Sequence, residues 1–329
     1  MTKMIDAKSV ETKLAAKALA KWRCRHGRYE EALEAMSQTH DMSGVEGTGM
    51  LLMGMPGLGK SSILASYVRN HLASRTDLET PDGSREPIIL VSVPAEPTLK
   101  TLIQEILLAS SYQGSIAGTI GELKQKLNVF ISERGVEMII FDEFQHFLRE
   151  QAKSNTRGVV NHIKLMMDKH KLAVVMAGTP PGYRSIAQHE ELYQRFAHRQ
   201  IRLRPFDAQE NGRINEFAKY MRAYSRFLER QNVRTIQLDS EDMLVRLYLA
   251  TKGIPRLITH LLRASVDNAE PGKTVARKDL ARAFGKSSLI PELDRFNPFT
   301  AKSDKVLERA NVAFLKARQE DAGHWRINP

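Results

Sequence analysis

The stretch "GMLLMGMPGLGKSS", Gly49 to Ser62, decides how the rest of the chain is interpreted. Four apolar residues are followed by three glycines within six positions, and then by a lysine and two serines. Glycine is a poor strand or helix former, so this density of glycine predicts a backbone shaped for close approach by a ligand. The apolar run before the glycines predicts a strand, and the segment from Lys60 onward predicts a helix.

The glycines and the lysine fit the pattern G-x-x-x-x-G-K-[ST] between a predicted strand and a predicted helix, which is the context the pattern requires. Glycines let backbone N–H groups turn inward around phosphates, and the start of the helix adds partial positive charge. The lysine would reach the β and γ phosphates of ATP, and the first serine would ligate Mg²⁺. The predicted nucleotide-binding residues are Gly54, Gly57, Gly59, Lys60, Ser61 and Ser62.

A second motif, "MIIFDEFQH", is an apolar strand that ends in Asp142 and Glu143. A carboxylate at the carboxyl end of a neighbouring strand is suited to holding Mg²⁺, and we assign that role to Asp142. Glu143 is predicted to polarise the attacking water. The alternative is an acidic helix cap after a strand.

Three further features narrow the class of nucleotide-binding protein. "AVVMAGTP" ends in Thr179, which is predicted to sense the γ-phosphate or position the water, a structural turn being the alternative. Arg195 in "LYQRFAHRQIRLRPF" ends a predicted helix and is a candidate for an arginine offered to a neighbouring subunit, with Arg199 or a surface salt bridge as alternatives. Arg256 in "TKGIPRLITHLL" starts a helix from which it would contact the γ-phosphate of its own subunit. The chain has no Asn-Lys-x-Asp string, which argues against a GTPase.

Strands and helices alternate from Met50 to Phe206, so the fold class is α/β, with a parallel five-stranded sheet flanked by helices. We expect an N-terminal helical extension and linker over 1–47, a nucleotide-binding domain over 48–206, a helical lid over 207–285 and a C-terminal tail over 286–329. The stretch Ser74 to Pro87 is predicted to be a surface loop, and the first lid helix is predicted over 208–231. The predicted strands are Met50–Met53, Ile88–Val93, Met138–Phe141, Ala173–Ala177 and Ile201–Leu203.

The composition of the 329 residues is that of a soluble globular protein, with 42% apolar and 26% charged residues. A formal charge of +11 favours a polyanionic partner, and nucleic acid is the commonest one. One cysteine excludes an intrachain disulfide, the N-terminus is polar, and no stretch approaches the ~20 apolar residues of a membrane span. We therefore expect a cytoplasmic protein with no membrane partner.

The residues from about 48 to 285 resemble the AAA+ ATPases by the order and spacing of their motifs. "GMPGLGKS" resembles the Walker A motif, "MIIFDE" Walker B, "AGTP" sensor 1, "QRF" the arginine-finger box and "GIPR" sensor 2. Within that class, "FDEFQHFL", "MAGTP" and "RFAHRQIRLRPF" are similar to the TnsC/TniB transposition regulators, of which CRISPR-associated transposons carry short versions.

The resemblance implies a Mg²⁺-dependent ATPase that forms a homo-oligomer on double-stranded DNA, a ring or a filament of roughly six or seven subunits per turn. Such a protein links a TniQ-type target selector to the transposase. By position in the resemblance, Lys100 and Thr119 would face DNA. A solvated helix residue is the alternative for Lys100, and a helix cap with Glu122 is the alternative for Thr119.

Two other functions fit the same residues. One is a different AAA+ DNA machine, such as a helicase loader or replication initiator, although too few residues follow the lid for an added winged-helix domain. The other is a nucleotide-gated scaffold that does not need DNA.

The C-terminal tail would dock a partner through "RFNPF", or else fold back on its own lid.

Overall fold

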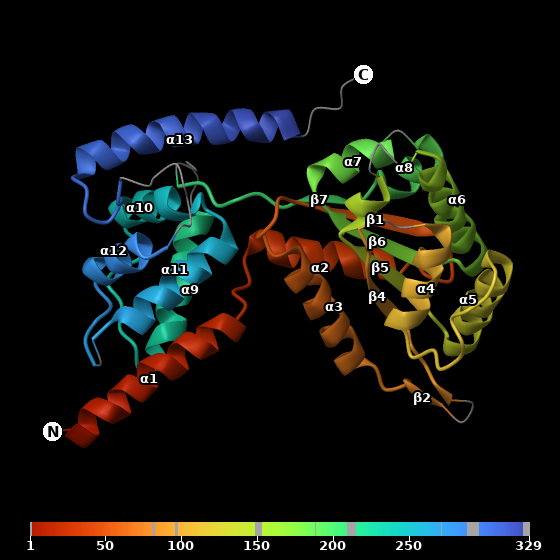
Figure 1. Ribbon diagram of the computed structural model, residues 1–329, viewed down its shortest axis with the longest axis horizontal. Helices are drawn as coiled ribbons and strands as arrows, with labels where there is room; N and C mark the ends of the chain where they lie inside the picture. The colour runs from red at the N-terminus through yellow and green to blue at the C-terminus, as the bar shows by residue number, and fades with distance from the viewer. Residues whose placement is uncertain are drawn as a thin grey trace. The chain divides into compact units, whose positions relative to one another are not determined.

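The computed structural model describes residues 2–80, 83–95, 98–148, 153–187, 189–208, 215–270, 272–287 and 296–324. These residues form two compact units (Figure 1). An α/β unit comprises residues 28–56 and 60–203, and a helical unit comprises residues 1–27, 57–59 and 204–323.

The α/β unit is built on a five-stranded sheet in the order β4-β5-β6-β1-β7, and every pair of neighbouring strands is parallel. The strand that precedes the glycine-rich loop therefore lies inside the sheet, with β6 on one side and β7 on the other. This confirms the predicted fold class. The strands are β1 (Thr48–Met53), β4 (Ile88–Ser92), β5 (Met138–Asp142), β6 (Ala173–Gly178) and β7 (Gln200–Arg202).

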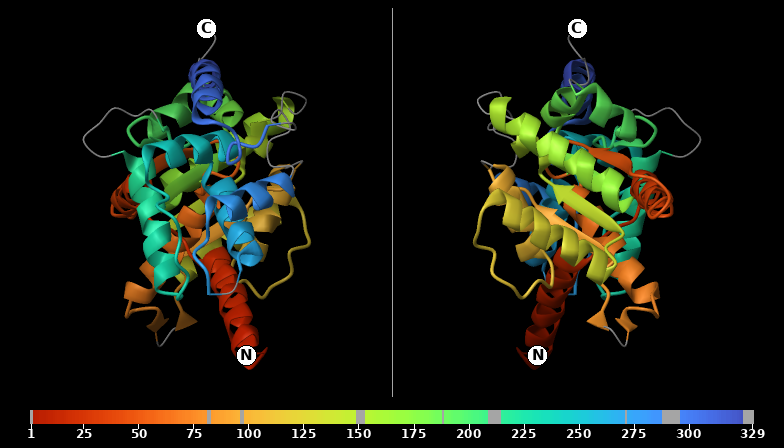
Figure 2. Two further views of the ribbon diagram at one scale, coloured as in Figure 1. Left: turned by 90° about the vertical axis from the view of Figure 1, so that its left-hand side faces the viewer. Right: turned by 90° about the vertical axis from the view of Figure 1, so that its right-hand side faces the viewer.

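Alternate strand residues point to the same side, and those of one face pack against five helices. Leu51 and Met53 of β1 and Ile139 and Phe141 of β5 share one buried apolar cluster with residues from these helices. The helices are α4 (Leu99–Ala109), α5 (Ile120–Arg134), α6 (Lys153–His170), α7 (Pro180–Ala187) and α8 (Glu190–Phe196). α5 and α6 can be followed over this side of the sheet in Figure 2 (right).

Two helices lie together over the opposite face, α2 (Gly27–His40) and α3 (Lys60–Ser74) (Figure 1). α3 contacts β4 and β6 and buries Ile63, Leu64 and Tyr67. The sheet is thus covered on both faces, which is why its strands consist of continuous apolar runs rather than alternating ones.

Two sequence predictions need correction in this unit. β1 begins at Thr48, two residues before the predicted start of this strand at Met50. The predicted loop from Ser74 to Pro87 carries a short antiparallel hairpin, in which β2 (Glu79–Thr80) pairs with β3 (Gly83–Ser84). Two-residue strands of polar composition have no apolar pattern for sequence analysis to detect.

The helical unit contains α1 (Thr2–Lys21), α9 (Glu216–Glu229), α10 (Glu241–Thr251), α11 (Pro255–Asn268), α12 (Arg277–Gly285) and α13 (Ser303–His324). α1 packs on α11, with Ala15, Ala16 and Leu19 buried in the same apolar cluster. The first predicted lid helix is too long, because α9 begins only at Glu216. Asn215 caps it by accepting hydrogen bonds from the N–H groups of Phe217 and Ala218, and residues 209–214 lie outside the described residues.

The end of the described chain folds back on this helical unit, the second of the two alternatives for the tail. Phe299 is buried, and Phe314 of α13 stacks on Tyr248 of α10 with ring centroids 4.4 Å apart. Arg246, 1% exposed, pairs with Asp242 at 2.7 Å and donates hydrogen bonds to the carbonyl groups of residues 298 and 301. A buried guanidinium satisfied in this way fixes the segment that precedes α13.

Candidate nucleotide site

The loop between β1 and α3 has the backbone that a phosphate-binding loop needs. Gly57 and Gly59 adopt φ values of 85° and 98°, which residues with a side chain rarely adopt. The N–H of Gly54 donates to the carbonyl of Gly178, so the start of the loop is tied to the end of β6 at 3.0 Å. The glycines of the motif are therefore required by the path of the loop.

Lys60 is the first residue of α3, and its side chain is only 5% exposed. Its ammonium donates to the carbonyl of Gly54 at 2.7 Å and to that of Met55 at 3.3 Å. A buried charge requires such partners. The loop thus holds its own cation in place against the carbonyls that begin it.

Ser61 and Asp142 meet across 81 positions of sequence. The Ser61 hydroxyl donates to Oδ2 of Asp142 at 2.6 Å, while Oδ1 accepts the Glu143 N–H at 2.9 Å. A hydroxyl and a carboxylate in contact are oxygen donors of the type that Mg²⁺ prefers. The donor set fits the predicted metal, and these two residues would hold it.

Glu143 follows β5 in a left-handed backbone conformation, with φ 58°. Its carboxylate accepts a hydrogen bond from the side-chain amide of Gln145, in the 3₁₀ turn η1 (Phe144–Leu148). Oε1 of Gln145 in turn accepts the backbone N–H of Thr179 at 3.1 Å. One glutamine therefore links the predicted catalytic carboxylate to the residue after β6.

Sequence analysis missed Gln145. Its place two residues after the Asp-Glu pair was the one signal available, but the contact itself depends on the left-handed turn at Glu143. The end of β6 leaves room for it: a Cβ on Gly178 would lie 2.6 Å from Oε1 of Gln145. The glycine of "AGTP" thus admits this side chain.

Hydrogen bonds connect Ser61, Asp142, Glu143, Gln145 and Thr179 into one chain at the carboxyl ends of β5 and β6. Lys60 is next to Ser61 in the first turn of α3, as is Ser62. The structure therefore brings together most residues that the sequence assigned to nucleotide and metal. Thr179 enters through its backbone N–H, and the role of its hydroxyl remains a prediction.

Arg195 has a partner within its own subunit. Its Nη1 lies 2.8 Å from Oδ1 of Asp168 on α6, and its Nη2 donates to Oδ2 at 3.0 Å. The guanidinium side chain is 25% exposed. The other candidate, Arg199, lies 3.5 Å from the hydroxyl of Thr48. The salt bridge considered as an alternative for this arginine is present.

Comparison with known families gives the first evidence beyond the chain itself. A family model described as "Bacterial TniB protein" matches residues 16–205, more than half of the chain. The chain belongs to the TniB family. Among curated proteins, none matches the sequence.

Solved structures similar to this TniB-family chain include AAA+ ATPases. Aeropyrum pernix ORC2, solved in ADPNP-ADP complexes, has a TM-score of 0.56 and 13% identity over 84% of this chain and 71% of its own. Cdc6p from Pyrobaculum aerophilum has a TM-score of 0.53 and 14% identity, over 79% and 67%. The Aeropyrum pernix ORC1 protein in complex with DNA has a TM-score of 0.52 and 16% identity over 78% of this chain. This chain covers 63% of that ORC1 protein, less than two thirds of its length. At these identities the likeness concerns the fold, which is that of the AAA+ ATPases.

Three further predicted residues of the TniB-family chain are not members of this hydrogen-bonded chain. Arg256 is in the first turn of α11, in the helical unit, and its backbone N–H donates to the carbonyl of Gly57 at 3.2 Å. Lys100 is exposed in the first turn of α4. Among the described residues, no helix is long and apolar enough to cross a membrane.

Thr119 is the N-cap of α5, the alternative considered for it. Its hydroxyl accepts the N–H of Glu122 at 3.3 Å, and the Glu122 carboxylate accepts the N–H of Thr119 at 2.7 Å. The hydrogen bonds that the N–H and the hydroxyl of Thr119 donate to this carboxylate lower the pKa of Glu122. Contact of Thr119 with DNA remains a prediction, to be reconciled with a hydroxyl already engaged in a cap.

Proposed function

We propose that this TniB-family protein is a Mg²⁺-dependent ATPase that assembles on double-stranded DNA in its ATP-bound form and connects a TniQ-type target selector to a transposase. The observation that carries the proposal is the hydrogen-bonded chain from Ser61 to Thr179 beside the buried Lys60. It brings the residues assigned to a phosphate loop, two oxygens suited to Mg²⁺ and the carboxylate of Glu143 near one another, which supports the proposal. The family match supports the link to transposition.

The site residues divide the work of phosphoryl transfer between binding and activation. The Lys60 ammonium would neutralise charge on the β and γ phosphates, while loop N–H groups hold their oxygens. Ser61 and Asp142 would hold Mg²⁺, which when bound neutralises charge that develops on the phosphates. Glu143 would orient the attacking water, and Gln145 fixes the direction of that carboxylate. Arg256 is assigned to the γ-phosphate of the same subunit.

Arg195 is the residue that we assign to contact between subunits. In the single subunit Asp168 holds this arginine in a bidentate ion pair, so its guanidinium is oriented before any partner arrives. We assign to it the nucleotide of a neighbouring subunit, in a ring or a filament of roughly six or seven subunits per turn. The formal charge of +11 favours DNA as the surface on which these subunits gather.

A Glu143→Gln variant tests this proposal. It keeps the size of the side chain and removes the charge that activates water, so turnover should fall by ~10²–10⁴ while ATP stays bound. A ligand that favours the assembled state stabilises it by mass action, and the variant should accumulate as rings or filaments on duplex DNA. Electron microscopy and sizing with ATP and Mg²⁺ over an hour measure this against wild-type assemblies, which should turn over.

Two outcomes separate the parts of the proposal. A variant that binds ATP tightly and stays monomeric on DNA would reject the assembly mechanism and leave the ATPase standing. Assembly without any effect on a reconstituted transposition reaction would favour a different AAA+ DNA machine, such as a helicase loader or replication initiator. A protein that assembles equally well without DNA would favour the nucleotide-gated scaffold.

A further inference from the structure

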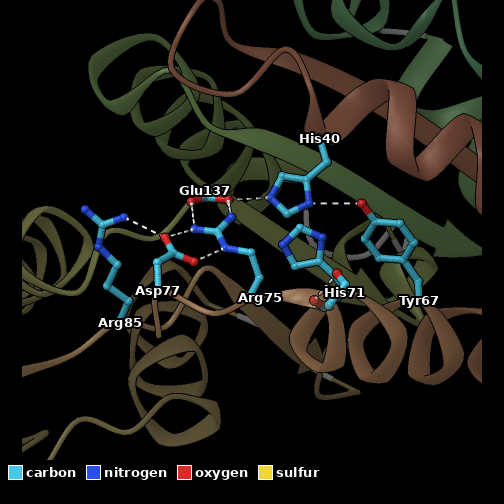
Figure 3. A network of polar contacts seen from close by, with 8 residues as sticks. His40, Tyr67, His71, Arg75, Asp77, Arg85 and Glu137 are labelled. Carbon is cyan, nitrogen blue, oxygen red and sulfur yellow. Dashed lines mark hydrogen bonds and ion pairs between the residues drawn. The ribbon is translucent and has the colours of Figure 1, made fainter. Parts of the chain in front are cut away.

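A second cluster of titratable side chains lies in the α/β unit and is drawn in Figure 3. His40 is the last residue of α2, His71 lies near the end of α3, and Glu137 directly precedes β5. Each side chain offers a ligand atom, and these three atoms lie within 4.8 Å of one another. Two imidazoles and a carboxylate from three separate elements thus converge on one point.

Nε2 of His40 and Nε2 of His71 are buried and lack aligned hydrogen bonds. His40 is 4% exposed, and its Nε2 has Oε2 of Glu137 as an ion-pair partner 3.1 Å away. Nε2 of His71 has no hydrogen-bond partner among the described residues. Buried polar atoms in native proteins nearly always have a partner, so the His71 nitrogen beside this carboxylate calls for a ligand that accepts its lone pair.

Outer groups already orient two of these side chains, His40 and Glu137. Nδ1 of His40 is 2.9 Å from the hydroxyl of Tyr67, and Glu137 accepts from Arg75 at both carboxylate oxygens, each at 2.9 Å (Figure 3). The same Arg75 donates to Asp77, from Nε to Oδ1 at 2.5 Å and from Nη2 to Oδ2 at 2.7 Å. Outer partners of this kind fix metal-binding histidines and carboxylates in many sites. Arg75 also competes for Oε2, but Oε1 and Asp77 can retain it when Oε2 turns to another cation.

The donor set indicates the class of metal. Two nitrogens and one oxygen suit zinc and its neighbours in the first transition row better than Mg²⁺. At Zn–ligand distances of about 2.0–2.1 Å, tetrahedral ligand atoms lie roughly 3.3 Å apart, so the cluster must contract. Glu137 is 27% exposed and can rotate, whereas His40 is held by burial. One fixed ligand and adjustable partners make that contraction feasible.

We propose that His40, His71 and Glu137 bind one zinc ion, with water completing its coordination. The ion fastens the end of α2 to α3 and to the start of β5. It stabilises the folded α/β unit, because the unfolded chain does not hold these three ligands together. This inference does not depend on the proposed ATPase.

The test uses untagged full-length protein freed of metal with a chelator, because a polyhistidine tag would itself bind zinc. Calorimetric titration with Zn²⁺ should give one equivalent bound. The midpoint temperature of thermal unfolding should rise by about 5 °C at saturating zinc. Co²⁺ should give the visible absorption of a tetrahedral site and lose it on addition of Zn²⁺. X-ray absorption of the zinc-loaded wild type should report two imidazole ligands.

Variants assign the ligands. His71→Ala should weaken zinc at least ~100-fold, and Tyr67→Phe, which removes only an outer hydrogen bond, about 10-fold. The matched control is His170→Ala, a partly buried histidine of α6 that hydrogen-bonds Asn128 and should bind zinc like the wild type. Absence of stoichiometric zinc in the wild type, or wild-type affinity in His71→Ala, would overturn the proposal. If a variant fails to fold, the ligand count from X-ray absorption of the wild type decides, and a site without two imidazoles rejects it.

Discussion

The two ends of α3 and β5 make an instructive comparison, because each element serves one site at each end. Ser61 and Asp142 meet at one end, and His71 and Glu137 meet at the other. Ten residues separate Ser61 from His71 along α3, which corresponds to about 15 Å. The first pair is hydrogen-bonded directly. The second pair belongs to a cluster in which Nε2 of His71 has no hydrogen-bond partner among the described residues and Glu137 is held by an ion pair with Arg75.

The difference follows from how parallel sheets are wound. Residues that follow strands gather at the carboxyl edge of the sheet, so a phosphate loop and an acidic pair placed after two strands must meet there. Glu137 precedes its strand, and His40 and His71 stand near helix ends, where no recurring motif marks them. The carboxyl edge is therefore predictable from sequence, and the opposite edge is not.

The largest expected effect separates the two ends. Lys60→Ala should abolish ATP binding, because the only buried lysine among the described residues is lost from the phosphate loop. The same variant should bind zinc as the wild type does. Fluorescent-nucleotide titration and zinc calorimetry measure the two, with Lys169→Ala as a surface-lysine control. Normal ATP binding by Lys60→Ala would remove the phosphate-loop assignment, and loss of both ligands would show that the ends are not independent.

Arg195→Ala asks whether the nucleotide end is complete within one subunit. An arginine supplied by a neighbour contributes ~10³–10⁵ in rate, so turnover should fall by up to that factor while ATP binding by isolated subunits stays nearly intact. Mixing Arg195→Ala with Lys60→Ala subunits should restore some hydrolysis at mixed interfaces. Asp168→Asn, which loses the ion pair and keeps the arginine, should stay within a few-fold of wild type. Equal losses in Asp168→Asn and Arg195→Ala, with no rescue on mixing, would make the arginine structural.

Gln145 sharpens the description of the hydrogen-bonded chain. Gln145→Ala should lower kcat about 10- to 100-fold with little change in KM, since a catalytic group released from its position loses rate rather than binding. Gln145→Glu should lose more, because two carboxylates would meet. Its activity should recover as pH falls and the pair takes up a proton. A flat pH profile relative to wild type would contradict a direct contact with Glu143.

The smallest effect concerns a surface outside both ends. Lys100→Ala should weaken binding to all duplex sequences alike and lower the slope of log K against log salt by about one unit, the amount for one lost phosphate contact. Fluorescence anisotropy at several salt concentrations measures the slope, again with Lys169→Ala as control. An unchanged slope would take Lys100 off the DNA surface.

Sequence patterns anticipated what depends on local order along the chain. The strands of the sheet and the loop at Lys60 follow from apolar runs and glycine positions, and the structure confirms that fold. Gln145 was missed because its contact depends on the left-handed turn at Glu143, which no propensity marks. The ion pair of Arg195 was considered only as an alternative, because its partner Asp168 lies on another helix.

Gly49, the first residue of the phosphate-loop stretch, allows the end of α8, which carries Arg195, to pack close to β1. The aromatic ring of Phe196, the neighbour of Arg195 in α8, packs directly against the Cα of Gly49. A Cβ at this position would lie 2.5 Å from that ring. A single methyl group would have to push that ring, and with it the end of α8, outward. The absence of a side chain at position 49 thus sets the distance between β1 and the end of α8, where Arg195 lies. If Arg195 acts on a neighbouring subunit, its position there would depend on this contact inside the core.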